Sequence, residues 1–466
     1  MTRSSEAWLK FMLARVAGLV IDSAVLGAAY FAAFLLRFDF IEPRWGWRVV
    51  AHSFVTVLAV CLASLMACGC YRMSWRRTRL TDIPWYMIAS AIACLAMTAL
   101  RYFTPVDAYL HLRPPYSINL IYFVIGTAGI IGWRALWTWC SRVFVREENL
   151  IERPTVHMDS SSVIRFLRGK TVMVTGAGGS IGSEIVRQVA GASPARILMV
   201  ERGENALYQI EREMRRLGPE TELKALMVDV NDIDRMTRIF ETYHPEVVLH
   251  AAAYKHVPMV EMNPEEGWRN NAEATKNLAE LSAVHGVRRF VLISTDKAVN
   301  PASVMGKTKR AAEKAIMDLN AQLDDPASKF SSAGSQLSLC AVRFGNVLGS
   351  SGSVVPLFRE QIEKRLPVTV THPGMKRYFM TVREAVGLVL QAASRSEKAI
   401  YTLDMGKPVS ILDLAENMIR QAGYKPYVDI PIIFTGIRPG EKLAEELDVS
   451  EKSCYKTDMA KIYITK

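Results

Sequence analysis

Two neighbouring residues, Asp296 and Lys297, place an acid and a base side by side in the sequence. They follow Thr295 and the apolar run Phe290–Ile293, which the pattern predicts to be a buried strand. An Asp-Lys dipeptide is usually a solvated surface pair. Here it would lie at the carboxyl end of a parallel strand, where ligands bind in open α/β sheets. The position therefore favours proton-transfer chemistry over a surface role.

A glycine-rich turn, TGAGGSIG, spans residues 175–182 and predicts a second site. The strand-like run Thr171–Val174 comes before it and the helical run Ser183–Val189 after it. In this context glycines let backbone N–H groups approach a pyrophosphate at a helix N-terminus. The pattern predicts dinucleotide binding, with these residues as contacts: Gly176, Gly179, Ser180, Ile181 and Gly182.

The acidic Glu201 ends the second strand-like run, 19 residues after Gly182. This spacing suits a carboxylate that binds the ribose hydroxyls of NAD. Arg202 beside it could instead receive a 2′-phosphate, so NADP stays open. Asp229 and Val230 follow the run Ala225–Val228 and are candidates for the adenine edge. After the run Val247–His250, Ala251 and Ala252 are further cofactor candidates.

The elements that must position these residues alternate between short apolar strands and amphipathic helices from about residue 163 onward. This order predicts an α/β fold: a Rossmann-type doubly wound parallel sheet with a small C-terminal substrate-binding part, together residues 151–466. None of the 7 cysteines belongs to a CxxC pair or a Cys/His cluster with zinc spacing, so no metal site is predicted.

Residues 1–150 predict a different kind of structure, a bundle of four transmembrane helices that anchors the protein. Each of its apolar runs approaches the length that crosses a bilayer, and they are Val16–Leu36, Val49–Tyr71, Ile83–Leu100 and Pro114–Trp133. These residues hold 15 Lys and Arg against 8 Asp and Glu, so the basic excess of the chain belongs mainly here. That distribution favours membrane topology over nucleic-acid binding.

The arginines also predict the orientation of the anchor. Arg72, Arg76, Arg77 and Arg79 lie between the second and third runs, which places that loop and both ends in the cytoplasm. We therefore expect a multi-pass protein of the inner membrane, with lipid around the helices and the catalytic part in the cytoplasm. Asp22 in the first run is expected to contact Arg15 or another helix rather than to mark a transport path.

Longer motifs carry a resemblance to a known family. They are His250–Pro258, Ser294–Ala298, Arg343–Ser350 and Val368–Pro373. With the TGxxGxxG turn, they resemble the CapD-like polysaccharide-biosynthesis family of the extended short-chain dehydrogenase/reductases, which includes membrane-bound UDP-N-acetylglucosamine 4,6-dehydratases. The resemblance covers about residues 160–450. Longer family members carry a further domain between membrane and catalytic parts, and the usual Asp of the His-Pro-Asp stretch is Gly374 here.

The resemblance implies an internal redox dehydration of a UDP-sugar, with NAD or NADP as the hydride carrier. Hydride leaves C4, the C5 proton and C6 hydroxyl are eliminated, and the hydride returns to C6. Asp296 would be the acid for the C6 hydroxyl and Lys297 the base at C5. The superfamily's usual Tyr is Met305 here, so the C4 proton must go elsewhere: to Lys297, to Thr295 through a water, or to Lys309, which also binds the nicotinamide ribose.

The resemblance also implies a nucleotide-sugar site built from Lys255, Asn346, Arg377, Arg438 and Glu441, with the two arginines as diphosphate candidates. Other expectations are a homo-oligomer and membrane glycosyltransferases that use the product. Two rival functions stay open: a UDP-hexose 4-epimerase, and a non-catalytic NAD(H) or nucleotide-sugar sensor. The sequence does not decide between UDP and dTDP sugars or fix the C5 stereochemistry.

Overall fold

The computed structural model describes residues 3–38, 46–71, 82–103, 116–144, 160–218, 220–328, 330, 336–446 and 453–465. The chain divides into two compact units. One contains Met1–Arg146 and Met418–Ile430, and the other contains Glu147–Asn417 and Pro431–Lys466. The first holds the apolar N-terminal helices, and the second holds the mixed α/β part.

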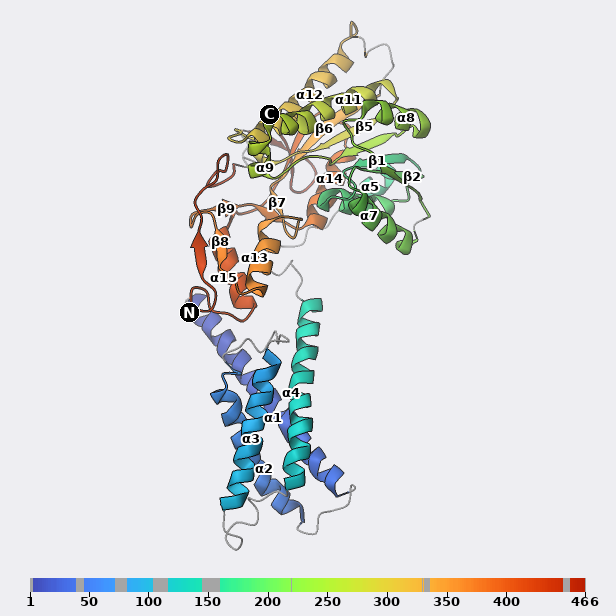
Figure 1. Cartoon of the computed structure of the whole chain (residues 1–466). Coiled ribbons are helices and arrows are strands. Elements are labelled where there is room, and N and C mark those ends of the chain that lie inside the picture. The colour runs from blue at the N-terminus through green and yellow to red at the C-terminus, as the bar shows by residue number, and fades with distance from the viewer. Residues whose placement is uncertain are drawn as a thin grey trace. The chain divides into compact units, whose positions relative to one another are not determined.

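The first unit is built from long helices (Figure 1), which are α1 (Arg3–Arg37), α2 (Gly46–Ala67), α3 (Ile83–Phe103) and α4 (Tyr116–Phe144). Among the described residues, 3 segments are long and apolar enough to cross a membrane, and they are Ala17–Arg37, Ile83–Phe103 and Tyr116–Trp137. In α2 the described apolar stretch is the shorter Ser53–Ala67. Four crossings therefore stay a prediction, as does the orientation, because Arg72, Arg76, Arg77 and Arg79 lie outside the described residues.

Asp22 pairs with Arg134, a residue of α4 just beyond the fourth apolar run. Both side chains are fully buried. Trp133 Nε1 donates to Asp22 Oδ1 at 2.9 Å, and Arg134 Nη1 donates to the Tyr86 hydroxyl of α3 at 2.8 Å. Asp22 thus contacts another helix, one of its two expected partners. The pair and its neighbours connect α1, α3 and α4, which is a packing role.

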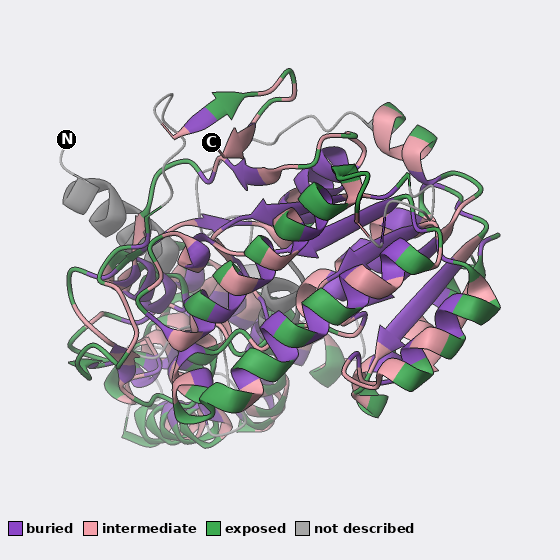
Figure 2. Cartoon of the chain, turned by 90° about the horizontal axis from the view of Figure 1, so that it is seen from above, coloured by how far each residue is buried: buried purple, intermediate pink, exposed green. Residues whose placement is uncertain are grey.

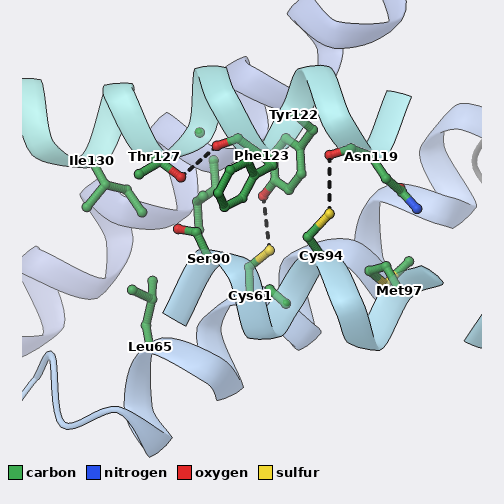
Figure 3. Close-up of a pocket in the computed structure, with 13 residues that line it drawn as sticks. Cys61, Leu65, Ser90, Cys94, Met97, Asn119, Tyr122, Phe123, Thr127 and Ile130 are labelled. Atoms are coloured by element: carbon green, nitrogen blue, oxygen red, sulfur yellow. Dashed lines mark hydrogen bonds between the residues drawn. The ribbon is translucent and has the colours of Figure 1, made fainter. Parts of the chain in front are cut away.

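A small cavity of about 20 Å³ lies between these helices (Figure 3). Around it, the Tyr122 hydroxyl donates to Cys61 Sγ at 3.3 Å and Cys94 Sγ lies 3.9 Å from the Asn119 carbonyl. A volume of this size holds about one water molecule.

The second unit is organised around a 9-stranded sheet of order β14-β15-β11-β6-β5-β4-β1-β2-β3. Its parallel strands are β1 (Thr171–Thr175), β2 (Arg196–Glu201), β3 (Glu222–Met227), β4 (Val247–His250), β5 (Arg289–Ile293), β6 (Ser338–Arg343) and β11 (Ile400–Leu403). β15 (Ile462–Thr465) runs antiparallel to β11 and to β14 (Cys454–Lys456). The predicted doubly wound sheet is confirmed; the third strand begins three residues earlier than its predicted run.

Helices cover both faces of this sheet, as Figure 1 shows. One layer packs against one core through α5 (Ser160–Leu167), α6 (Ser180–Ala190), α7 (Glu204–Leu217) and α14 (Val382–Ala393). The opposite core is covered by α8 (Ile233–Tyr243), α11 (Ala274–Val284) and α12 (Val304–Asp324). Figure 2 shows the central strands buried and the outer helix faces exposed, which is the pattern of strands covered on both faces.

Shorter elements complete the edge of the sheet where the site forms. After β4 come α9 (Val257–Met262), α10 (Pro264–Trp268) and a π-helical turn, Arg269–Glu273; after β5 comes a 3₁₀ turn, Asp296–Ala298. The C-terminal part contains α13 (Val354–Glu363), α15 (Ile411–Gln421) and small strand pairs: β7 (Asn346–Val347) with β10 (Phe379–Met380), β8 (Val368–Val370) with β13 (Ile432–Phe434), and β9 (Lys376–Arg377) with β12 (Val409–Ser410).

Candidate active site

A cavity of about 660 Å³ lies at the carboxyl ends of β1, β4 and β5, where open α/β sheets bind ligands. It brings together residues from the glycine turn, the loop after β4, the loop after β5, the start of α12 and the C-terminal part. The predicted residues that line it are Gly176, Gly179, Ser180, Ile181, Gly182, Ala251, Lys255, Thr295, Lys297, Met305, Lys309, Asn346, Arg377, Arg438 and Glu441. Distant parts of the sequence therefore form one site.

The glycine turn leaves no room for side chains at its closest approaches. Gly176 has φ +66°, and a Cβ there would lie 2.8 Å from the backbone nitrogen of Ala252. A Cβ on Gly182 would lie 2.0 Å from the Gly176 carbonyl oxygen. The turn leads directly into α6, whose first residue is Ser180. This tight strand-turn-helix fits a pyrophosphate against backbone N–H groups.

The residues predicted to distinguish NAD from NADP and to bind adenine do not line the cavity. Glu201 accepts hydrogen bonds from the backbone N–H groups of Gly178 at 3.1 Å and Gly203 at 2.9 Å. The Arg202 guanidinium stacks on the Tyr254 ring at 4.6 Å and lies 3.8 Å from Asp229. Val230 is buried, at 5% exposure. A carboxylate beside the glycine turn fits a ribose diol, while Arg202 is engaged by Tyr254 and Asp229.

Lys309 and Met305 occupy one turn at the start of α12, where Ser303 caps the helix. Lys309 is buried, and its ammonium donates to the Ile293 carbonyl at 2.6 Å. Burial lowers the pKa of Lys309 to about 8, although Glu313 opposes the shift. Met305 packs with Val257 and Val260. Met305 therefore presents an apolar thioether to the cavity, close to Lys309.

Asp296 and Lys297, the predicted acid and base, form a hydrogen-bonded cluster with Thr295 and Asn346. Lys297 Nζ donates to Asp296 Oδ1 at 2.9 Å and to Asn346 Oδ1 at 3.2 Å. The Thr295 hydroxyl donates to the same Asp296 oxygen at 2.8 Å. Asp296 itself is 1% exposed and stands outside the cavity lining, behind Thr295 and Lys297. The structure thus brings the pair together but presents only the lysine to the cavity.

The C-terminal part supplies the wall opposite the sheet. Arg377 Nη2 donates to the Lys442 carbonyl at 2.9 Å and Nη1 to the Leu443 carbonyl at 3.2 Å. This arginine is therefore engaged by backbone rather than presented freely to a diphosphate. Arg438 is exposed at the cavity and better suited to that role. Glu441 Oε2 lies 3.4 Å from the Arg438 backbone N–H, so it supports the turn that carries Arg438.

Glu445 and His256 line the cavity but were not among the predicted site residues. Glu445 lines the cavity at 8% exposure and lies within ion-pair distance of Lys297 and Arg377. It lies three residues after Lys442, the last residue of the Arg-Pro-Gly-Glu-Lys element, and no local pattern marked it. His256 also lines the cavity, against Gly352, and the sequence alone did not separate it from an ordinary packing histidine.

The sheet order, glycine turn and Lys309 define a Rossmann-type protein of the short-chain dehydrogenase/reductase class. The chain belongs to the polysaccharide biosynthesis protein family, whose model matches residues 172–466. It is 51% identical over 305 residues to the probable polysaccharide biosynthesis protein EpsC of Bacillus subtilis, covering 65% of this chain and 49% of EpsC. The chain thus spans about half the length of this relative. The expected family is confirmed.

More distant relatives carry names that specify a reaction. A UDP-N-acetylglucosamine 4,6-dehydratase (inverting) of Campylobacter jejuni is 30% identical, covering 62% of this chain and 80% of that protein. A UDP-glucose 4-epimerase of Rickettsia prowazekii is also 30% identical, with 63% and 82% covered. The X-ray structure of Pen from Bacillus thuringiensis is similar with a TM-score of 0.57 at 30% identity, covering 64% of this chain and 90% of Pen.

Proposed function

We propose that this protein is a membrane-anchored, NAD-dependent dehydratase that converts UDP-N-acetylglucosamine to a UDP-4-keto-6-deoxy sugar for surface polysaccharide or glycan synthesis. The observation that carries the proposal is Lys297, held by Asp296 and Asn346 in the same cavity as the glycine turn. A dehydration needs a base and an acid beside the sugar, in addition to a hydride acceptor.

The residues of the site divide the reaction between them. The glycine turn of residues 176–182 would hold NAD⁺, which when bound would supply a hydride acceptor for C4 and a hydride donor for C6. Lys297 removes the C5 proton, and the electrons of that C–H bond form the C5–C6 double bond as the C6–oxygen bond breaks. When hydride then adds to C6, Lys297 returns a proton to C5. Asp296 accepts a hydrogen bond from the Thr295 hydroxyl, and Thr295 lines the cavity while Asp296 does not. With this hydrogen bond reversed, Asp296 would supply the proton of the departing water through that hydroxyl.

The proton of the C4 hydroxyl needs an acceptor other than Met305, because a thioether does not accept it at any useful pH. Thr295 lines the cavity and can pass this proton through a water. Lys309 contributes the nearby positive charge. Thr295 follows the end of β5, and Lys309 donates to the carbonyl of its last residue, Ile293. This is the place where the sugar would meet the cofactor.

The test is incubation of the detergent-solubilised full chain with UDP-N-acetylglucosamine and NAD⁺, followed by the mass of the product. We expect loss of one water, and expect Lys297→Ala to abolish it while cofactor binding persists. A new hexosamine of unchanged mass would replace the proposal with the epimerase. Bound cofactor without any turnover would instead favour the sensor.

An epimerase is the second candidate because the Rickettsia enzyme is as similar as the dehydratase. The two functions make different demands on Asp296. Epimerisation returns hydride to C4 and breaks no bond at C6, so Asp296→Asn should leave it largely intact. Dehydration should lose most of its rate in this variant, because the departing water needs a proton.

The proposed location is the inner membrane, with residues 1–150 as anchor and residues 151–466 as the cytoplasmic catalytic part. The apolar helices support membrane association. Anchoring would bring the product close to membrane glycosyltransferases, and we propose a homo-oligomer as in other short-chain dehydrogenases/reductases. If a soluble fragment of residues 163–466 restored glycan synthesis in cells as well as the full chain, the proposal that anchoring aids delivery of the product would be contradicted.

A further inference from the structure

Glu445 places a second carboxylate beside Lys297, within the cavity. Its Oε1 atom lies 3.7 Å from Lys297 Nζ and 3.9 Å from Arg377 Nη2. The side chain is 5% exposed and lines the cavity, whereas Asp296 does not. Glu445 is therefore the carboxylate that a sugar in this cavity would meet next to the lysine.

The segment just before Glu445 is attached at two places, which fixes where this carboxylate lies. Arg377 donates to the carbonyls of Lys442 and Leu443, and the Lys376 N–H donates to Leu443 at 3.0 Å. Lys442 Nζ in turn lies 3.4 Å from the Val299 carbonyl, just after the acid–base pair. The C-terminal segment is thus attached both to β9 and to the loop after β5, and Glu445 is carried to Lys297 by these attachments.

The three partners of Lys297 differ in distance. Asp296 and Asn346 accept hydrogen bonds at 2.9 and 3.2 Å, while the Glu445 oxygen at 3.7 Å is an ion-pair contact. These three contacts fix the position of the Lys297 amine. The two carboxylates lie where positive charge develops as the amine takes the C5 proton.

We propose that Glu445 is a positioning residue for Lys297: it orients the amine toward the sugar and stabilises the ammonium formed during elimination. This inference rests on the proposed dehydratase function. Oxidation at C4 uses other residues, so Glu445 should affect elimination and leave the first step intact. A residue that only supported the fold would affect both steps together.

The experiment compares Glu445→Gln and Glu445→Asp with the wild-type full chain, and uses Glu446→Gln as matched control. Glu446 is the adjacent exposed residue and contacts Asn300 and Lys442 instead. Single-turnover absorbance of the reduced nicotinamide reports C4 oxidation, and product mass against time reports water loss. Thermal unfolding with and without NAD⁺ checks that each variant is folded.

For Glu445→Gln we expect water loss to slow by about tenfold or more, while C4 oxidation and KM stay close to wild type and reduced nicotinamide accumulates. Glu445→Asp should recover part of the rate, and Glu446→Gln all of it. Unchanged water loss in Glu445→Gln, or equal loss of both steps in the two Glu445 variants, would overturn the inference. If wild type oxidises the sugar without losing water, the dehydratase proposal itself fails, which is a separate result.

Discussion

At the scale of single residues, Lys309 gives the site a pH dependence with a defined sign. Burial lowers its pKa to about 8, below the ordinary 10.5. The ammonium is therefore present below pH 8 and lost above it, so kcat/KM for dehydration should fall as pH rises past about 8. The free energy of unfolding should instead rise with pH in this range, because the unfolded chain binds more protons than the folded one between pH 8 and 10.5.

The measurement for Lys309 is a pH series of both initial rate and thermal midpoint on wild type and Lys309→Met. The variant should have low activity, without this alkaline limb, and a smaller rise of stability over the same pH range. An alkaline limb that persists unchanged in Lys309→Met would assign it to another group.

His250 predicts a loss of stability in acid. It is buried between Thr175 and Thr275, whose hydroxyls lie 2.7 and 3.0 Å from its ring nitrogens. Burial, and then the charge of Lys309, lower the pKa of His250 to about 3 from 6.5. The unfolded chain binds more protons between these values, so stability falls as pH drops through this window, by up to about 1.4 kcal/mol per pH unit.

Replacing His250 with Asn should reduce this dependence, since the amide does not titrate. The measurement is the change in thermal midpoint of the full chain between about pH 7 and pH 5. His244→Asn is the control: His244 is exposed, and its φ of +46° is a conformation that Asn tolerates. Equal acid sensitivity in wild type and His250→Asn would refute the assignment.

At the scale of elements, the glycine turn and α6 act as one unit. Gly182→Ala would force a methyl group to within 2.0 Å of the Gly176 carbonyl oxygen, so the turn must open. We expect NAD⁺ affinity, measured by calorimetry, to fall by about a hundredfold, because the backbone N–H groups leave the pyrophosphate. Gly191→Ala, at the other end of α6, meets its nearest atom at 3.4 Å and should bind like wild type. Comparable affinity in both variants would exclude this turn as the cofactor site.

Attachment of α12 to the sheet depends on a buried charge cluster that no sequence pattern signalled. Glu313 accepts from Arg343 Nε at 2.7 Å and from Ser294 Oγ at 2.7 Å, and all three are buried. The cluster joins α12 to β6 and to the residue just before the Thr-Asp-Lys motif. Because Lys309 lies one turn earlier on α12, this attachment fixes its ammonium against β5.

The features that the sequence predicted correctly depend on residues that are close together along the chain. Strand periodicity, the glycine spacing and the Asp-Lys pair after β5 each depend on neighbouring residues, and the sheet brings their ends together as expected. Glu445 could not be found this way, because its partner Lys297 lies far away in sequence and no periodicity links them. Burial of Asp296 and the engagement of Arg377 by backbone carbonyls likewise follow from tertiary packing. Arg134 was not predicted as the partner of Asp22 because it lies just outside an apolar run.

At the scale of the whole molecule, the number of crossings decides on which side of the membrane the catalytic unit works. With the N-terminus in the cytoplasm, as predicted, four spans place the loop of residues 72–81 in the cytoplasm and residues 104–115 outside. If residues 53–67 do not cross, both assignments reverse and the catalytic unit lies outside. Nucleotide sugars and NAD are cytoplasmic metabolites, so the proposed reaction requires the first arrangement.

Truncated chains fused to a protein that fluoresces only in the cytoplasm measure this directly. We expect fluorescence for a fusion after Arg79 and none for a fusion after Val106, with a fusion at the C-terminus fluorescent again. The asymmetry of arginines is the physical reason, because moving the cluster Arg72, Arg76, Arg77 and Arg79 across the membrane is costly. Replacing these four residues with Gln should reduce the difference in fluorescence between the fusions after residue 79 and after Val106. Fluorescence only after Val106 would place the catalytic unit outside and so contradict the cytoplasmic dehydratase.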